Sequence, residues 1–276
     1  MKRLVTIQDI SCFGKCSQTV ALPIISALGI ETVILPTAIL STHTGNFKDY
    51  TFLSLEDEIP KIIDHWKRIN LKFDAIYIGY VGNLKLLNII NDFIDYFADE
   101  STFVYIDPAM ADNARLYSGL DEEYAKALSL LCKKATLISP NIYEAMILSD
   151  CGIKSNYTYK DASEILTNLS EKYNDVIITG IHTGEKIITL GKKKNDFSTV
   201  IKENKLIEGT FFGTGDIFAS VFAGAYLNGI SFKDSIYFAD DFVSQCILNT
   251  LPEISKYNYG INYESCMNIL RNFKNH

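Results

Sequence analysis

The chain has 276 residues, 47% of them hydrophobic, and a formal net charge of −7. This size and apolar content are enough for a sizeable core. The chain has no linker-like stretch and no internal repeat, so we expect one domain spanning residues 1–276. The negative charge argues against nucleic acid as a partner, because general binding to a polyanion requires a basic surface.

The sequence also bears on compartment. No apolar run approaches the roughly 18 residues needed to span a bilayer, and a β-like segment directly follows Met1, Lys2 and Arg3 where a signal peptide would need its apolar region. We therefore expect a cytoplasmic protein with no membrane partner. The six cysteines have neither zinc-site nor Cys-x-x-Cys spacing, so we expect most of them to be reduced thiols in the core.

In chain order, short β-branched runs alternate with longer segments of helical period. The expected strands cover residues 4–7, 32–35, 75–78, 102–106, 136–138 and 176–179. The expected helices cover residues 19–28, 55–69, 84–97, 122–133, 142–148 and 162–173. Near-continuous apolar strands of this kind are typical of a mostly parallel central sheet with helices on both faces. The fold class is therefore α/β.

The last third of the chain adds an edge and two helices. Residues 186–190 and 197–201 are expected to form an antiparallel edge hairpin, with Lys192, Lys193 and Lys194 in its solvated turn. Two helices are expected to follow, over residues 216–228 and 232–248.

Polar residues collect where the expected strands end. In an open sheet of this class, ligands bind outside the carboxyl ends of the strands, so these residues are candidates for a site. They are Gln8 and Asp9, Gly79 and Tyr80, Asp107 and Pro108, Asn141 and Glu144, and Thr179 and Gly180.

The segment Gly213-Thr214-Gly215-Asp216 stands where a loop enters a long apolar helix. Two glycines and the start of a helix can turn several backbone N–H groups toward one anion, which predicts a phosphate pocket. Asp216 would repel a stored phosphate, but it suits a general base that deprotonates an attacking hydroxyl. The alternative is that Asp216 only caps the helix while the glycines form a tight turn.

Four sequence pieces resemble the ribokinase-like superfamily and, within it, the pyridoxal kinase branch. The resemblance covers essentially the whole chain and implies a three-layer sandwich with an antiparallel edge. The pieces are Gly213 to Asp216, Asp107-Pro108-Ala109-Met110, Ser139-Pro140-Asn141 with Glu144, and Ser41-Thr42-His43-Thr44-Gly45.

The resemblance implies an ATP-dependent kinase for the 5′-hydroxymethyl group of vitamin B6 vitamers. Catalytic roles fall to Asp216 as the base and to Gly213, Thr214 and Gly215 around the γ-phosphate. Substrate contacts fall to Asp9, Thr44, Gly45, Tyr80 and Asp216. ATP contacts fall to Asp107, Asn141, Glu144, Thr179, Gly213 and Gly215, with Mg²⁺ near Asp107 and Glu144. A monovalent cation such as K⁺ and a homodimer are implied as well.

Departures from the family pattern leave alternatives open. Asp9 stands where these kinases usually carry serine, so it is expected to pair with a protonated ring nitrogen unless it only braces the following loop. Thr179 and Gly180 stand where some relatives have lysine, and residues 111–119 are expected to form a short flap. Asp107 can also initiate a turn and Glu144 a helix. Rival functions are a kinase for hydroxymethylpyrimidine or another small alcohol, and a non-catalytic binding protein.

Overall fold

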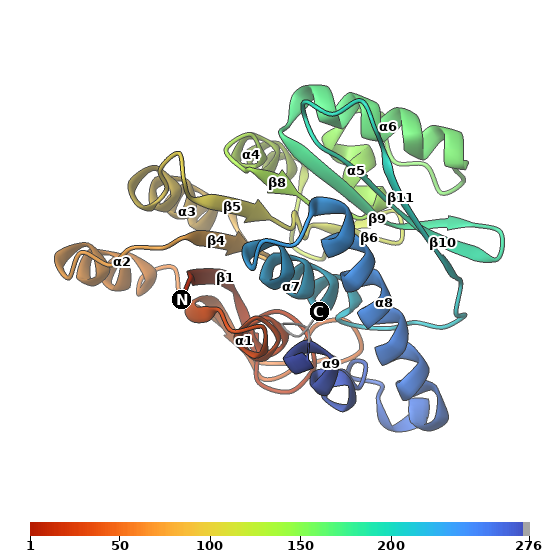
Figure 1. Ribbon diagram of the computed structural model, residues 1–276. Coiled ribbons are helices and arrows are strands. Elements are labelled where there is room, and N and C mark those ends of the chain that lie inside the picture. The colour runs from red at the N-terminus through yellow and green to blue at the C-terminus, as the bar shows by residue number, and fades with distance from the viewer. Residues whose placement is uncertain (273–276) are drawn as a thin grey trace. The chain divides into compact units, whose positions relative to one another are not determined.

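The computed structural model describes residues 1–272 and divides into two compact units (Figure 1). Unit 1 combines residues 1–75 with the segment from residue 207 onward, and unit 2 comprises residues 76–206. The single domain expected from the sequence stays a prediction.

Unit 1 is built on three paired strands and a set of helices. The strands are β1 (Arg3–Ser11), β2 (Glu31–Leu40) and β3 (Phe52–Ser54). β2 pairs parallel with β1 and antiparallel with β3. The helices are α1 (Gln18–Ala27), α2 (Ile59–Arg68), α7 (Thr214–Leu227) and α8 (Phe232–Thr250), followed by η1 (Leu251–Lys256), η2 (Glu264–Cys266) and α9 (Met267–Asn272).

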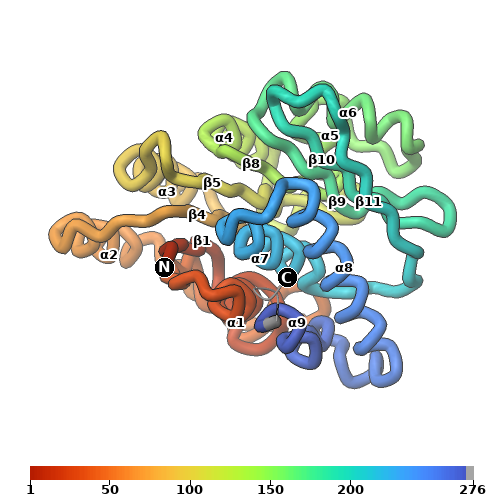
Figure 2. Tube along the Cα trace, viewed as in Figure 1, coloured from red at the N-terminus to blue at the C-terminus, as the bar shows by residue number. Residues whose placement is uncertain are grey.

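Helix α7 is the centre of unit 1. It packs against α1 on one side and α8 on another, as the tube view also shows (Figure 2). Its residues from Ile217 to Ala225 are buried without interruption, so it is apolar around its whole circumference. A helix with this pattern belongs in a core, and a charged side chain at its start is therefore held close to low-dielectric surroundings.

Unit 2 contains a mostly parallel sheet with an antiparallel edge. Its strand order is β11-β10-β9-β8-β5-β4. The bounds are β4 (Ala75–Ile78), β5 (Phe103–Ile106), β8 (Leu137–Ile138), β9 (Asp175–Thr183), β10 (Lys186–Lys192) and β11 (Val200–Lys205). The helices are α3 (Leu84–Phe97), α4 (Glu122–Cys132), α5 (Ile142–Leu148) and α6 (Tyr159–Lys172), and a small hairpin joins β6 (Ala111–Asp112) to β7 (Arg115–Leu116).

The expected elements are present with shifted bounds. Helices 84–97 and 142–148 have the predicted limits, whereas the helix expected from residue 55 begins at Ile59 because residues 52–54 form β3. The edge hairpin is longer than predicted: β10 includes Lys192, and β11 begins at Val200. β11 has only two apolar residues, at its start, and four polar ones after them, so it gives no apolar run. No helix among residues 1–272 is long and apolar enough to cross a membrane.

A proline inside α1 creates a hydrogen-bond vacancy that the C-terminal segment fills. Pro23 has no N–H, so the carbonyl of Thr19 loses the partner that residue i+4 normally supplies. The buried Tyr263 hydroxyl donates to this carbonyl at 2.8 Å. The chain just before η2 is therefore fastened to the first turn of α1.

We expect Tyr263→Phe to lower the free energy of unfolding by about 1–2 kcal/mol, because it leaves a partly buried carbonyl unpaired. In a Pro23→Ala background the same change should cost much less, since the N–H of residue 23 then donates to Thr19. Urea denaturation of the four proteins in this double-mutant cycle measures both costs. Equal costs in the two backgrounds would contradict the assignment.

Candidate active site

The start of α7 requires glycine at one position and leaves space at another. Gly213 has φ 81°, the left-handed region, and a Cβ there would overlap the backbone carbonyl oxygen of Lys15. Gly215 lies in the first turn of α7, is exposed, and a Cβ there would meet no atom within 4 Å. The helix start thus offers open N–H groups and the positive end of a 14-residue helix.

Asp216 is the acidic residue in the first turn of this helix. Burial raises the pKa of its carboxyl group to about 7, with a smaller upward contribution from the charge of Asp9. The backbone N–H of Ser17 acts in the opposite direction by stabilising the charged form. A carboxylate with this pKa is a suitable general base near neutral pH.

Asp9 lies inside β1 rather than after it, since the strand continues to Ser11. The pairing of β1 with β2 is irregular between Gln8 and Ile10: Asp9 alone stands opposite two residues of β2, Thr37 and Ala38, so it faces a bulge in that strand. Asp9 is buried and accepts the Ser11 hydroxyl at 3.1 Å. Burial raises the pKa of its carboxyl group, and the hydroxyls of Ser17 and Ser11 partly counteract this.

Ser17 connects the two carboxylates and was missed by the sequence analysis. Its hydroxyl faces Asp9, while its backbone N–H faces Asp216. As the residue before α1 it has the composition of an N-cap, yet its side chain makes no capping hydrogen bond. Its φ of 51° and ψ of −131° cost about 1–3 kcal/mol in a non-glycine residue. No local sequence signal distinguishes this strained serine from an ordinary cap.

The loop at residues 41–45 belongs to the same unit and contacts the residue before Gly213. The Gly45 N–H donates to Nδ1 of the buried His43 at 3.0 Å, and burial lowers the His43 pKa. The Phe212 ring lies 5.1 Å from the His43 ring. A Cβ on Gly45 would come within 2.5 Å of the Phe212 ring. Thr44 is exposed at the tip of this turn.

In unit 2, Glu144 fastens two segments together. Asn141 and Glu144 form a capping box at the start of α5. The buried Glu144 carboxylate also accepts backbone N–H groups from Met110 at 3.0 Å and Ala111 at 3.3 Å, in addition to Asn141 at 2.9 Å. Burial raises its pKa to about 7. Glu144 therefore does have the helix-start role that the sequence left open. Its carboxylate also holds the backbone of Met110 and Ala111, in the segment that follows Asp107.

Among the other predicted residues of unit 2, Tyr80 and Asp107 follow strands as expected, whereas Thr179 lies inside β9 (Asp175–Thr183) because that strand continues four residues beyond its predicted end. Asp107 follows β5 and is partly exposed, and its N–H donates to the carbonyl of Ile78 at 2.8 Å. The Thr179 N–H donates to Pro140 at 3.0 Å. The ring of Tyr80 lies 6.3 Å from that of Tyr117, so Tyr80 contacts the segment predicted as a flap, which contains the β6–β7 hairpin.

The predicted site residues thus fall into two groups. Asp9, Thr44, Gly45 and residues 213–216 lie in unit 1, and Tyr80, Asp107, Asn141, Glu144 and Thr179 lie in unit 2. Asp9 lies in β1, Glu144 in α5, Thr179 in β9 and residues 214–216 in α7, and the others lie in the segments between elements. The described residues contain no group of three or more His, Cys, Asp or Glu side chains that could hold a metal ion. Asp107 and Glu144 are a pair of carboxylates rather than a group of three.

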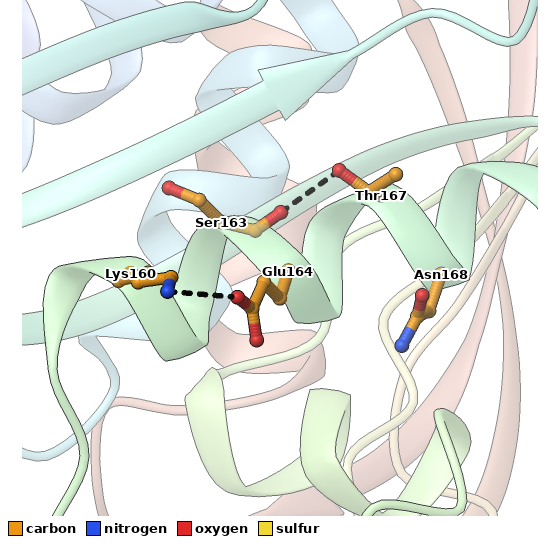
Figure 3. Close-up of a pocket in the computed structure, with 5 residues that line it drawn as sticks. All are labelled: Lys160, Ser163, Glu164, Thr167 and Asn168. Atoms are coloured by element: carbon orange, nitrogen blue, oxygen red, sulfur yellow. Dashed lines mark hydrogen bonds and ion pairs between the residues drawn. The ribbon is translucent and has the colours of Figure 1, made fainter.

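A hollow elsewhere in unit 2 contains none of these residues (Figure 3). It is lined by Lys160, Ser163, Glu164, Thr167 and Asn168, all from α6. Lys160 and Glu164 form an ion pair at 3.8 Å, and Thr167 donates to the Ser163 carbonyl at 3.0 Å. These are ordinary contacts along one solvated helix face.

Comparison with known proteins identifies the class. A crystal structure from Bacteroides thetaiotaomicron, of a "putative phosphomethylpyrimidine kinase", has a TM-score of 0.94 at 34% identity and covers 98% of this chain and 93% of its own. This confirms the α/β fold with a mostly parallel sheet, an antiparallel edge and flanking helices. A second crystal form of that protein, with pyridoxal, has a TM-score of 0.92 and covers 98% of this chain and 95% of its own.

The family model for phosphomethylpyrimidine kinase matches residues 22–262. The chain therefore belongs to the phosphomethylpyrimidine kinase family. A "putative pyridoxal kinase" of Schizosaccharomyces pombe is 29% identical over 238 residues, 80% of this chain and 73% of the relative. A hydroxymethylpyrimidine/phosphomethylpyrimidine kinase of Aquifex aeolicus is 28% identical over 230 residues, 80% of this chain and 85% of the relative. The resemblance to pyridoxal kinases is confirmed.

The two glycines at the start of α7 should respond differently to alanine. Gly213→Ala should lower the free energy of unfolding by about 2 kcal/mol or more, because it combines a left-handed φ with a backbone overlap. Gly215→Ala is the matched control and should leave stability unchanged or slightly higher, since alanine favours helix. Urea denaturation measures both, and equal stability of the two variants would contradict the close approach of Lys15.

The raised pKa of Asp216 makes a further prediction for stability. The folded state binds this proton more tightly than the unfolded state, so the contribution of Asp216 to stability is full below about pH 3.8 and is lost as pH rises through about 7. Asp216→Asn should therefore match wild type near pH 4 and exceed it at pH 8 by up to about 4 kcal/mol. Denaturation curves at both pH values test this, and a difference that does not change with pH would contradict it.

Proposed function

We propose that this protein is an ATP-dependent kinase that phosphorylates the 5′-hydroxymethyl group of the vitamin B6 vitamers pyridoxal, pyridoxine and pyridoxamine. The observation that carries the proposal is Asp216: a carboxyl group with a pKa of about 7 in the first turn of a buried helix, beside the open backbone at Gly215. A binding protein needs no such base. The Bacteroides protein solved with pyridoxal supports the choice of substrate.

In the proposed reaction, Asp216 accepts the proton of the substrate hydroxyl as its oxygen forms a bond to the γ-phosphorus. The bond from that phosphorus to the leaving oxygen of the β-phosphate breaks, and ADP leaves. The N–H groups at Gly213, Thr214 and Gly215 would stabilise the charge on the transferring phosphoryl group. Thr44 and Gly45, in the loop at residues 41–45 that packs against Phe212, would contact the substrate.

We assign the substrate ring to Asp9. Asp9 and Asp216 raise the free energy of each other's charged forms, so a cation bound between them would be favoured over a neutral ring. A protonated pyridine nitrogen supplies that cation. Tyr80 is assigned to the face of the ring, because an aromatic side chain next to Gly79 at a strand end suits a flat ligand.

ATP and Mg²⁺ are assigned to unit 2. Asp107 is a partly exposed residue and is assigned the direct contact to a hard cation, whereas Glu144 already accepts three backbone N–H groups and would act through water. Bound Mg²⁺ would neutralise charge on the nucleotide phosphates. Asn141 and Thr179, which form a parallel bridge with each other, would contact the nucleotide. A monovalent cation such as K⁺ would bind at the same site.

The remaining assignments are a single kinase domain over residues 1–276, a homodimer and a cytoplasmic location. All six cysteines are free thiols, which agrees with a reducing compartment.

A second candidate is a kinase for hydroxymethylpyrimidine. The family to which the chain belongs and the Aquifex aeolicus relative favour it. Hydroxymethylpyrimidine also carries a ring nitrogen and a hydroxymethyl group, so Asp9 and Asp216 would serve in the same roles.

The test is turnover of ATP with Mg²⁺ on pyridoxal, pyridoxine, pyridoxamine and hydroxymethylpyrimidine in parallel, with products identified by mass spectrometry. We expect a 5′-phosphate of at least one B6 vitamer and an acidic limb in kcat/KM near pH 7. Asp216→Asn should lower kcat by about 10²- to 10⁴-fold while nucleotide binding persists.

Other results of these assays would change the proposed substrate or the proposed role of Asp216. Activity on hydroxymethylpyrimidine alone would establish the second candidate instead. Silence on all four alcohols would contradict both. An unchanged kcat in Asp216→Asn would remove this residue from the mechanism.

A further inference from the structure

Lys15 has its side chain enclosed by the C-terminal segment of unit 1. Its ammonium nitrogen lies 2.6 Å from Glu264 and sits over three tyrosine rings, at 4.8 Å from Tyr257, 5.6 Å from Tyr259 and 5.6 Å from Tyr263. Only 11% of the side chain is exposed. We call Tyr257, Tyr259, Tyr263 and Glu264 the Lys15 cage. A cation held by one carboxylate and several aromatic faces is fixed in position.

The backbone contacts in the same place are equally close. The Lys15 N–H donates to the carbonyl of Tyr259 at 3.0 Å. Gly260 has φ 134°, and a Cβ there would come within 2.6 Å of the Lys15 Cβ. The Lys15 cage therefore fixes the main chain of Lys15 as well as its charge.

The other side of Lys15 contacts the start of α7. Its carbonyl oxygen lies against Gly213, where a Cβ would overlap it. Two residues later, Ser17 directs its N–H toward Asp216 and its hydroxyl toward Asp9 from a strained backbone conformation. Strained residues keep their conformation only when their surroundings hold them, and the cage supplies that constraint on the residues just before Ser17.

We propose that Lys15 is a positioning residue for phosphoryl transfer: held by the C-terminal cage, it fixes the turn at residues 14–17 so that Ser17 aligns Asp216 and the loop at Gly213 keeps its shape. This inference rests on the proposed function. It makes residues 257–264, which are about 240 positions from Lys15 in the chain, an indirect part of the kinase site.

The choice of a charged side chain is consistent with this role. A buried lysine without its partner is costly, so the conformation with Glu264 and the three rings in place is strongly preferred over alternatives. Methionine has a similar shape and would fill the cage, but it would lose both the ion pair and the attraction to the rings. Arginine keeps both, so Lys15→Arg should retain much of the alignment.

The experiment compares Lys15→Met, Lys15→Arg and Glu264→Gln with wild type. The matched control is Lys256→Met, which removes an exposed ion pair to Glu253 from the same C-terminal region. We expect Lys15→Met and Glu264→Gln to lower kcat by up to about 10²-fold, as small misplacements of catalytic groups do. KM for the alcohol should change less than kcat does, because the cage acts mainly on the alignment of Asp216, while the loop at residues 41–45 reaches the turn only through Phe13 and Gly14. Lys15→Arg should recover most of the loss.

Amide hydrogen exchange tests the same proposal without substrate. In Lys15→Met, exchange should become faster at residues 14–18 and 213–217 and stay unchanged in unit 2, while Lys256→Met should resemble wild type. Folded Lys15→Met with wild-type kcat and exchange would overturn the proposal. A fall in kcat that only follows the loss of folded protein, with faster exchange across the whole of unit 1, would overturn it too.

The two proposals can fail separately. Wild-type protein that phosphorylates none of the four alcohols contradicts the proposed function. In that case local faster exchange at residues 14–18 and 213–217 still supports the positioning role of Lys15, and unchanged exchange overturns it.

Discussion

The contact between the Lys15 carbonyl and Gly213 is the constraint on which unit 1 depends, because it brings two loops distant in sequence to backbone contact. Any side chain at position 213 would separate them. With glycine present, the turn at residues 14–17 closes on the start of α7, and Ser17 reaches Asp216 and Asp9 together. The anion loop and the base are therefore products of one packing contact rather than of two local motifs.

Placing two carboxyl groups in this contact has an energetic cost. Burial raises the pKa of both Asp9 and Asp216, which means that the folded protein stores unfavourable charge when both are ionised. In the proposed function, a substrate that delivers a cation to Asp9 and a proton to Asp216 relieves that cost on binding and reaction. The destabilising feature would then be the one that prepares the site for chemistry, a trade between stability and function that active sites commonly show.

Much of this arrangement could be predicted from the sequence, and the failures have physical reasons. The helices at 84–97 and 142–148 and the glycine segment before Asp216 were predictable because strong periodicity and special backbone residues act locally. β11 was mislocated because four of its six residues are polar, so it lacks an apolar run. The sequence could not predict the role of Ser17, the hydrogen bond from Tyr263 to Thr19, or the Lys15 cage. Each depends on tertiary contacts between segments far apart or on a strained φ that composition does not encode.

Asp9 offers a chemical reason for choosing among ring substrates. Under the proposed function, the ionised Asp9 carboxylate stabilises a protonated ring nitrogen, so a readily protonated ring gains more from it than a weakly basic one. Serine at this position would donate or accept a neutral hydrogen bond and distinguish such rings less. In this proposal the aspartate at position 9 shifts recognition from shape toward ring charge, and the same cation also favours the ionised form of Asp216, whose pKa the charge of Asp9 helps to raise.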